Sequence, residues 1–262
     1  MYLSKLWREG RLITILALAA LVLFFAGVVR INSFLNMAHW QHPSPEQVYG
    51  AIVGLSMGLL YTESILVSFW GWLSAGIGLG KNLGEDSGAF LLTRPRPRAW
   101  FLWNDWGYTM AQIAVIVAAT NLIFLLAIHH VFALMQMAPS IPIDAGSGAI
   151  SVNFLMLLVS IAVLLCAGLI YGLAYLSTIL IQRTSGVMLG AGILLGYFIL
   201  RGALHHYAPS MHLPNLVMNI FAHVGHTGPQ LAGGLGLNIA ARILAMLAFP
   251  FAAQLILNRA EV

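Results

Sequence analysis

Residues 152–181 constrain this chain most, because they are thirty consecutive positions without a charged side chain. An α-helix of about 20 apolar residues crosses the hydrocarbon core of a bilayer, so this run indicates a membrane-spanning helix. Other apolar runs are long enough to do the same. The complete set of expected spans covers residues 12–29, 51–79, 103–131, 152–181, 186–200 and 239–257.

Composition supports a membrane class, since 60% of the residues are hydrophobic and only 8% are charged. Soluble domains carry about 25% charged residues. We predict an all-α integral membrane protein with a single domain over residues 1–262 and six spans. Residues 1–11 should form an amphipathic helix in the membrane interface. The long loop 201–238 should hold re-entrant or interfacial helices, because its apolar patch, residues 216–222, is too short to span.

The basic residues predict the orientation, because cytoplasmic loops of membrane proteins carry an excess of lysine and arginine. If the N-terminus is cytoplasmic, the outer side receives only Arg30 and Arg201. The cytoplasmic side receives Lys5, Arg8, Arg11, Lys81, Arg94, Arg96, Arg98, Arg183 and Arg259. Both termini are then expected in the cytoplasm. Most of the basic residues lie beside membrane segments, so the net charge of +4 indicates contact with lipid and not with nucleic acid.

The segment 80–98, GKNLGEDSGAFLLTRPRPR, is the longest polar interruption expected on the cytoplasmic side. Two acidic residues precede a predicted short helix, where they favour the positive end of its dipole. Three apolar residues give that helix one apolar face, and two prolines end the helix. Arginines that follow can pair with acidic groups of a partner. The residues concerned are Glu85, Asp86, Phe90, Leu91, Leu92, Arg94, Pro95, Pro97 and Arg98.

This segment resembles the cytoplasmic connection between the second and third helices of ABC-2-type permeases, the membrane subunits of one class of ABC exporters. The match consists of Glu85, Gly88, the run Leu91-Leu92-Thr93-Arg94-Pro95, and Arg98. The layout of the whole chain is similar as well. One departure is the sequence Asn104-Asp105, where members of the family commonly carry a lysine.

The resemblance implies a permease subunit of the bacterial cytoplasmic membrane that couples ATP hydrolysis by a separate subunit to export. Its partners would be two copies of an ABC ATPase, which bind ATP and Mg²⁺, and a second copy of this permease or a related one. The implied contact with the ATPase is a coupling helix made by Glu85, Asp86, Phe90, Leu91, Leu92, Arg94 and Arg98.

The chain itself is not expected to be an enzyme that hydrolyses ATP. Residues 75–82, AGIGLGKN, come nearest to a phosphate-binding loop. The motif G-x-x-x-x-G-K-[ST] requires a glycine where Ala75 stands and a hydroxyl residue where Asn82 stands. The segment also follows an apolar helix and not a strand. We therefore expect no cofactor in this chain.

Glu63 lies near the middle of the second expected span, where a charge costs about 2.5–3.5 kcal/mol on insertion scales. It either lines or gates a substrate route, or it is a structural glutamate bonded to neighbouring helices. Arg242 is expected at a different depth, so a direct pair is not predicted. In the fifth span, glycines spaced four apart permit close helix packing within or between subunits. They are Gly186, Gly190, Gly192 and Gly196.

Two other classes of function remain open on the sequence. Histidines expected on the outer side could serve a haem- or metal-handling protein or a membrane enzyme, although no H-x-x-x-H or H-E-x-x-H spacing is present. They are His129, His130, His205, His206, His212, His223 and His226. A secondary transporter that uses Glu63 as a proton carrier is the third reading, and the lack of inverted repeats weighs against it. Lipid, peptide, antibiotic and polysaccharide all remain possible cargoes.

Overall fold

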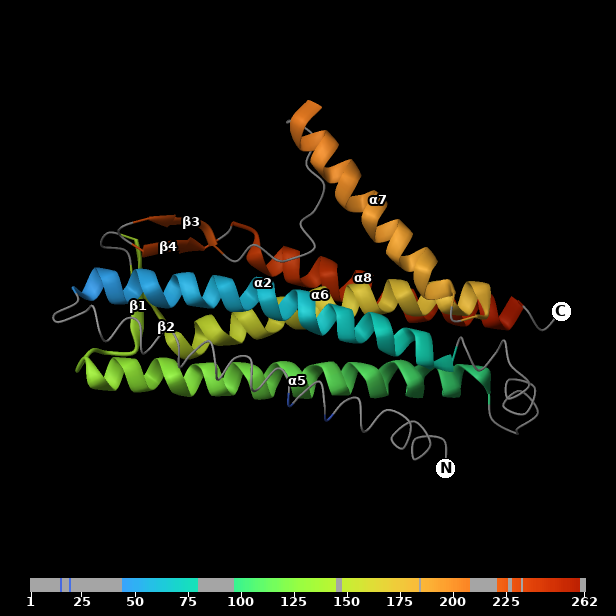
Figure 1. Cartoon of the computed structure of the whole chain (residues 1–262), viewed down its shortest axis with the longest axis horizontal. Coiled ribbons are helices and arrows are strands. Elements are labelled where there is room, and N and C mark those ends of the chain that lie inside the picture. The colour runs from blue at the N-terminus through green and yellow to red at the C-terminus, as the bar shows by residue number, and fades with distance from the viewer. Residues whose placement is uncertain are drawn as a thin grey trace.

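Long helices dominate the chain in a computed structural model (Figure 1), which describes Ile15, Ala19 and residues 44–79, 97–144, 148–183, 185–207, 221–225, 228–231 and 233–259. Five helices in these residues are long and apolar enough to cross a membrane. They are α2 (Pro45–Ile77), α5 (Arg98–Leu134), α6 (Val152–Ile181), α7 (Gly186–Tyr207) and α8 (Leu235–Arg259). The expected interfacial helix 1–11 and nearly all of the first expected span, 12–29, lie outside the described residues.

Local capping residues explain where two of these helices begin. The Ser44 hydroxyl accepts from the Gln47 amide at 3.3 Å, and the Gln47 side chain accepts from the Ser44 amide at 3.0 Å. This capping box, followed by Pro45, starts α2 six residues before the expected span. In the same way, the Ser151 hydroxyl accepts from the Phe154 amide at 3.2 Å and starts α6 at the expected residue.

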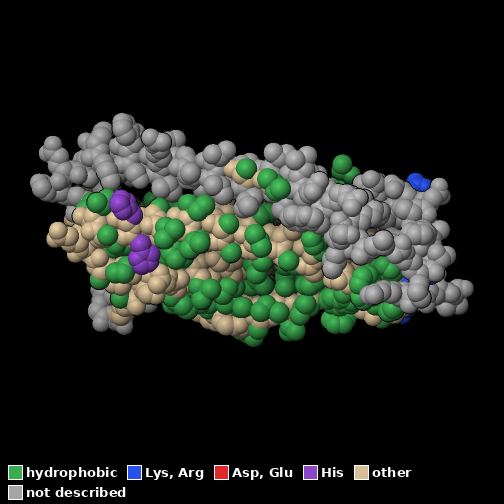
Figure 2. All heavy atoms as spheres, turned by 90° about the horizontal axis from the view of Figure 1, so that it is seen from below, with side chains coloured by type: hydrophobic (Ala, Val, Ile, Leu, Met, Phe, Trp, Pro, Cys, Tyr) green, Lys and Arg blue, Asp and Glu red, His purple; other side chains and the backbone are tan. Residues whose placement is uncertain are grey.

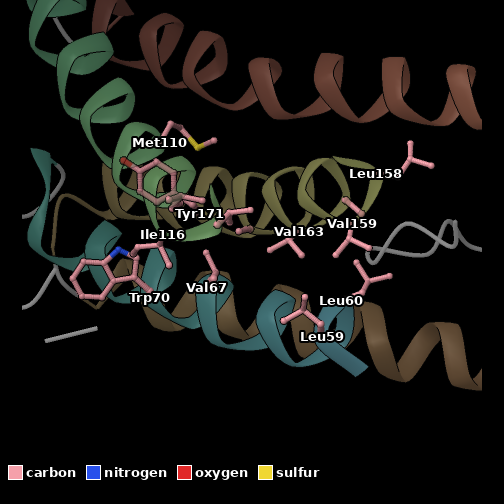
Figure 3. Close-up of a cluster of buried hydrophobic side chains, with 14 of the residues drawn as sticks. Leu59, Leu60, Val67, Trp70, Met110, Ile116, Leu158, Val159, Val163 and Tyr171 are labelled. Atoms are coloured by element: carbon pink, nitrogen blue, oxygen red, sulfur yellow. The ribbon is translucent and has the colours of Figure 1, made fainter. Parts of the chain in front are cut away.

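Helix α6 is the central element of the bundle, because it packs against α2, α5, α7 and α8. Its side chains Val159, Val163 and Tyr171 meet those of α2 and α5 in the core that Figure 3 shows. Figure 1 shows α2, α5, α6 and α8 running along one another, while α7 leans away from them. Helix α7 is accordingly the least buried of the five.

One end of the bundle holds the described helix ends that were expected to be cytoplasmic. The C-terminal end of α2, the start of α5, the α6–α7 connection and the end of α8 all lie together in Figure 1. Figure 2 shows hydrophobic side chains over most of the described middle of one face, basic side chains at this end and histidines at the opposite end. The helices therefore have the relative directions that the expected topology requires.

Two short hairpins at the opposite end correct the all-α prediction. Strands β1 (Ser140–Asp144) and β2 (Gly148–Ser151) pair antiparallel, as do β3 (Phe221–Gly225) and β4 (Gly228–Leu231). The second hairpin lies in the loop between α7 and α8, where re-entrant or interfacial helices were expected, and the described residues 221–225 and 228–231 form strands instead. Short apolar runs do not by themselves distinguish a helix from a strand.

Candidate functional site

The expected coupling segment lies almost wholly outside the described residues, which include only Arg98 of the residues assigned to it. Glu85, Asp86, Phe90, Leu91, Leu92 and Arg94 are therefore not placed. Arg98 is the first residue of α5, and its Nη1 donates to the Leu257 carbonyl of α8 at 3.5 Å. The segment is therefore followed by a helix whose first residue is hydrogen-bonded to the C-terminal helix α8.

The end of α2, just before this segment, is fixed to α5 by a buried carboxylate. The Leu79 amide donates to Asp105 Oδ2 at 2.6 Å, and Asp105 is 2% exposed. A Cβ atom placed on Gly78 would lie 2.7 Å from the same oxygen, so a larger residue at position 78 would crowd the carboxyl group. The two ends of the 80–97 connection are consequently held by helices that contact each other.

Tryptophans tie the other helices together at the same end. Trp72 of α2 donates from Nε1 to the Val187 carbonyl of α7 at 3.1 Å. Trp103 of α5 donates from Nε1 to Gln254 Oε1 of α8 at 2.9 Å. Indole rings favour the membrane interface, where one edge is apolar and the N–H finds a polar partner. These two bonds join α2 to α7 and α5 to α8 at the end of the bundle where the charged segment begins and ends.

Glu63 lies in the interior of the bundle and is bonded to a neighbouring helix. It is 0% exposed, and its Oε2 accepts from Asn121 Nδ2 of α5 at 2.9 Å. Thr120 lies beside the same carboxyl group. This is the contact that the structural interpretation of Glu63 requires. No described residue forms an ion pair with Glu63.

Only two of the four glycines assigned to helix packing have close neighbours. A Cβ on Gly186 or Gly190 would meet the backbone of α6, at 2.5 Å from the Ser177 oxygen and 3.2 Å from the Ala174 Cα respectively. A Cβ on Gly192 or Gly196 would meet no atom of the described residues within 4 Å. The first pair therefore packs within the chain, while the second pair lies on an open face of α7.

The outer histidines do not assemble a metal site in the part of the chain that is described. No group of three His, Cys, Asp or Glu side chains there could hold a metal ion. His129 instead pairs with Asn153 Oδ1 at 2.8 Å. His212 and His226 lie outside the described residues, as do the side chains of His205 and His223.

Sequence reasoning did not assign a role to Asp105 or to Asn121. Both are polar residues inside a helix whose other buried residues are mainly apolar. In a membrane helix such a residue faces the bundle interior and bonds to a polar partner. A polar side chain within an apolar helix was therefore the sequence signal that could have identified both residues. Their partners, Leu79 and Glu63, lie at the end of α2 and within it, and could be identified only from the packing.

The fold and these contacts define a mostly helical, multi-pass membrane protein. Comparisons with models of protein families, with curated proteins and with solved structures found no match to the chain.

Proposed function

We propose that this chain is the transmembrane permease subunit of an ATP-binding cassette exporter. A separate ATPase subunit would bind ATP and Mg²⁺ and act on the segment 80–98. Two copies of the ATPase and a second permease chain, identical or related, would complete the transporter. The complex would lie in a bacterial cytoplasmic membrane with both termini of this chain in the cytosol.

The observation that carries this proposal is the attachment of the charged segment to the bundle. The segment leaves α2 where Asp105 holds the Leu79 amide, and it enters α5 at Arg98, which bonds to α8. A force on the segment would therefore be transmitted to three membrane helices. Because α2 and α5 also pack on the central helix α6, such a force can change the arrangement of the core.

The charges of the segment fit a soluble partner better than a purely structural loop. Lys81, Glu85, Asp86, Arg94 and Arg96 stand within sixteen residues in a chain with only 8% charged residues. Charge pairs of this kind select a partner and orient it on docking. The apolar run Phe90-Leu91-Leu92 supplies the surface that would be buried between them.

Charge reversal at Glu85 and Arg94 tests the proposal. Tagged chain purified from its native membrane should bring down a protein with nucleotide-binding motifs, identified by mass spectrometry. The double variant E85K/R94D should lower its recovery at least about tenfold, because close charge pairs across an interface contribute more than about 1.4 kcal/mol.

The matched control is E46K, which reverses an exposed charge at the opposite end of α2. It should leave recovery of the ATPase unchanged. Failure to recover any ATPase with the unaltered chain, or equal recovery with E85K/R94D, would contradict the proposed function.

A further inference from the structure

The contact between Glu63 and Asn121 leaves one polar atom on each side chain without a hydrogen bond. Asn121 Nδ2 donates to Glu63 Oε2 and to the Val117 carbonyl, both at 2.9 Å. Both N–H groups of the amide are thereby used. Glu63 Oε1 and Asn121 Oδ1 remain, and both atoms are buried without a hydrogen-bond partner in the described part of the chain. Buried polar atoms are almost always paired, so two orphans on bonded side chains point to a missing hydrogen between them.

A single proton on the carboxyl group accounts for both orphan atoms. If Glu63 is ionised, Oε1 and Oδ1 are both acceptors and neither can satisfy the other. If Glu63 is protonated, Oε1 becomes a hydroxyl donor for Oδ1. The carboxylic acid and the primary amide then form two parallel hydrogen bonds, with Nδ2–H donating to Oε2 and Oε1–H donating to Oδ1. Burial away from water also favours the neutral acid.

Among the described residues, no charged side chain around Glu63 would replace the proton. On α5 the other polar neighbour is Thr120, whose hydroxyl group donates to the Ile116 carbonyl at 2.9 Å and does not titrate in the accessible range. Helix α6 contributes the buried thiol of Cys166, whose Sγ lies 3.9 Å from the hydroxyl oxygen of Ser68 on α2. Of the two arginines of α8, Arg259 is exposed in the last turn and Arg242 is buried, and neither is a partner of Glu63. Within the described residues, therefore, Glu63 has no positive partner.

We propose that Glu63 is a proton-binding site and that the protonated acid clasps α2 to α5 in the middle of the membrane. The closed clasp is the two-bond ring with Asn121. Separation of α2 from α5 would break both bonds and expose the acid, which could then release its proton to water. These two helices also hold the ends of the segment 80–97, so the clasp opposes the motion that would drive them apart. This clasp does not require an ATPase partner.

Infrared spectroscopy of the purified full chain in lipid nanodiscs tests the clasp directly. The wild-type spectrum minus that of E63Q at neutral pH should contain the carbonyl band of a protonated carboxylic acid, shifted downward in ²H₂O. The variant D105N is the matched control, because Asp105 is the other buried carboxyl group among the described side chains. It should retain the band assigned to Glu63. A difference spectrum with only carboxylate bands would overturn the proposal.

Thermal unfolding of the same protein and its Glu63 and Asn121 variants distinguishes a shared proton from simple packing of the two side chains. The Glu63→Gln amide can donate to Asn121 Oδ1 as the acid does, so its midpoint should equal that of the wild type. Glu63→Leu and Asn121→Leu should each lower the midpoint, and the double variant should lose less than the sum of the two. A Glu63→Gln protein that unfolds as early as Glu63→Leu, or does not fold, contradicts the clasp.

A bound metal cation is the remaining alternative, because an ionised carboxylate and a neighbouring amide oxygen could hold one. Replacing Na⁺ by choline at constant ionic strength should not change the wild-type midpoint. A stabilisation by Na⁺ that Glu63→Gln abolishes would show that the site takes an alkali cation, and the proton assignment would be wrong.

Discussion

Gly186→Ala is expected to lower the thermal unfolding midpoint of the chain, whereas Gly192→Ala in the same helix should leave it unchanged or raise it. A Cβ on Gly186 would stand 2.5 Å from both the Ser177 oxygen and the Thr178 Cα. These are backbone atoms of α6, the helix at the centre of the bundle, so they cannot move aside as a flexible side chain can. Overpacking of this kind costs about 1–3 kcal/mol.

Gly192 is the matched control because a Cβ there would have no neighbour within 4 Å among the residues that the structure describes. Alanine in a helix interior is about 0.5–1 kcal/mol more favourable than glycine, so this substitution should stabilise α7 slightly. Tryptophan fluorescence of the purified protein in detergent during heating measures both variants. Equal midpoints for Gly186→Ala and Gly192→Ala would show that α7 does not approach α6 at Gly186.

Asp105→Leu is expected to have the other large effect. It should lower the free energy of unfolding by about 2 kcal/mol and make residues 80–97 easier to cleave. The substitution removes the acceptor of the Leu79 amide, and a buried donor left unpaired costs about 1–3 kcal/mol. Asp105→Asn keeps an acceptor oxygen of the same reach and should lose clearly less. Thermal unfolding gives the first comparison.

Limited proteolysis of the same two variants gives the second comparison. If Asp105 fixes the exit of α2, cleavage within residues 80–97 should be faster in Asp105→Leu than in Asp105→Asn or the wild type. Identical stability and identical cleavage of the leucine and asparagine variants would mean that the bond to Leu79 does not fix this exit.

Helix positions were largely predictable because apolar run length is a strong signal in membrane segments. The run 152–181 coincides with α6, where Ser151 caps the first turn. Charged residues misled the prediction at one helix end. Arg201 was assigned to a loop, yet α7 continues to Tyr207, since a helix can extend beyond the apolar region with polar residues in its last turns. The expected span 186–200 is therefore seven residues short of the helix.

The buried pairs were not predictable, because a single sequence does not show which helix faces which. Glu63 was identified as unusual, but its partner Asn121 stands 58 residues away on α5. The glycines show the same limit. Their spacing is identical at Gly186-x-x-x-Gly190 and Gly192-x-x-x-Gly196, yet only the first pair packs on α6. Whether such glycines pack depends on which side of their helix is turned toward the neighbouring helix.

The hairpin in the loop between α7 and α8 shows a further limit of periodicity. Strand β3 begins at Phe221, inside the apolar patch that was expected to be a short helix. Residues 221–225 and 228–231 are separated by two residues, and such a spacing permits a tight antiparallel turn. A run this short fits the period of a helix as well as that of a strand. Gly225 and Gly228 were the residues that indicated a turn.

The central claim is that the segment 80–98 receives mechanical work from a soluble ATPase, and photo-crosslinking from Ala89 tests it most directly. A photoreactive amino acid at position 89, activated in intact cells, should capture a protein with nucleotide-binding motifs, identified by mass spectrometry. The same residue at position 46, at the opposite end of α2, should not capture it. Capture of the ATPase from position 46 but not from position 89, or of no ATPase from either, would contradict the account.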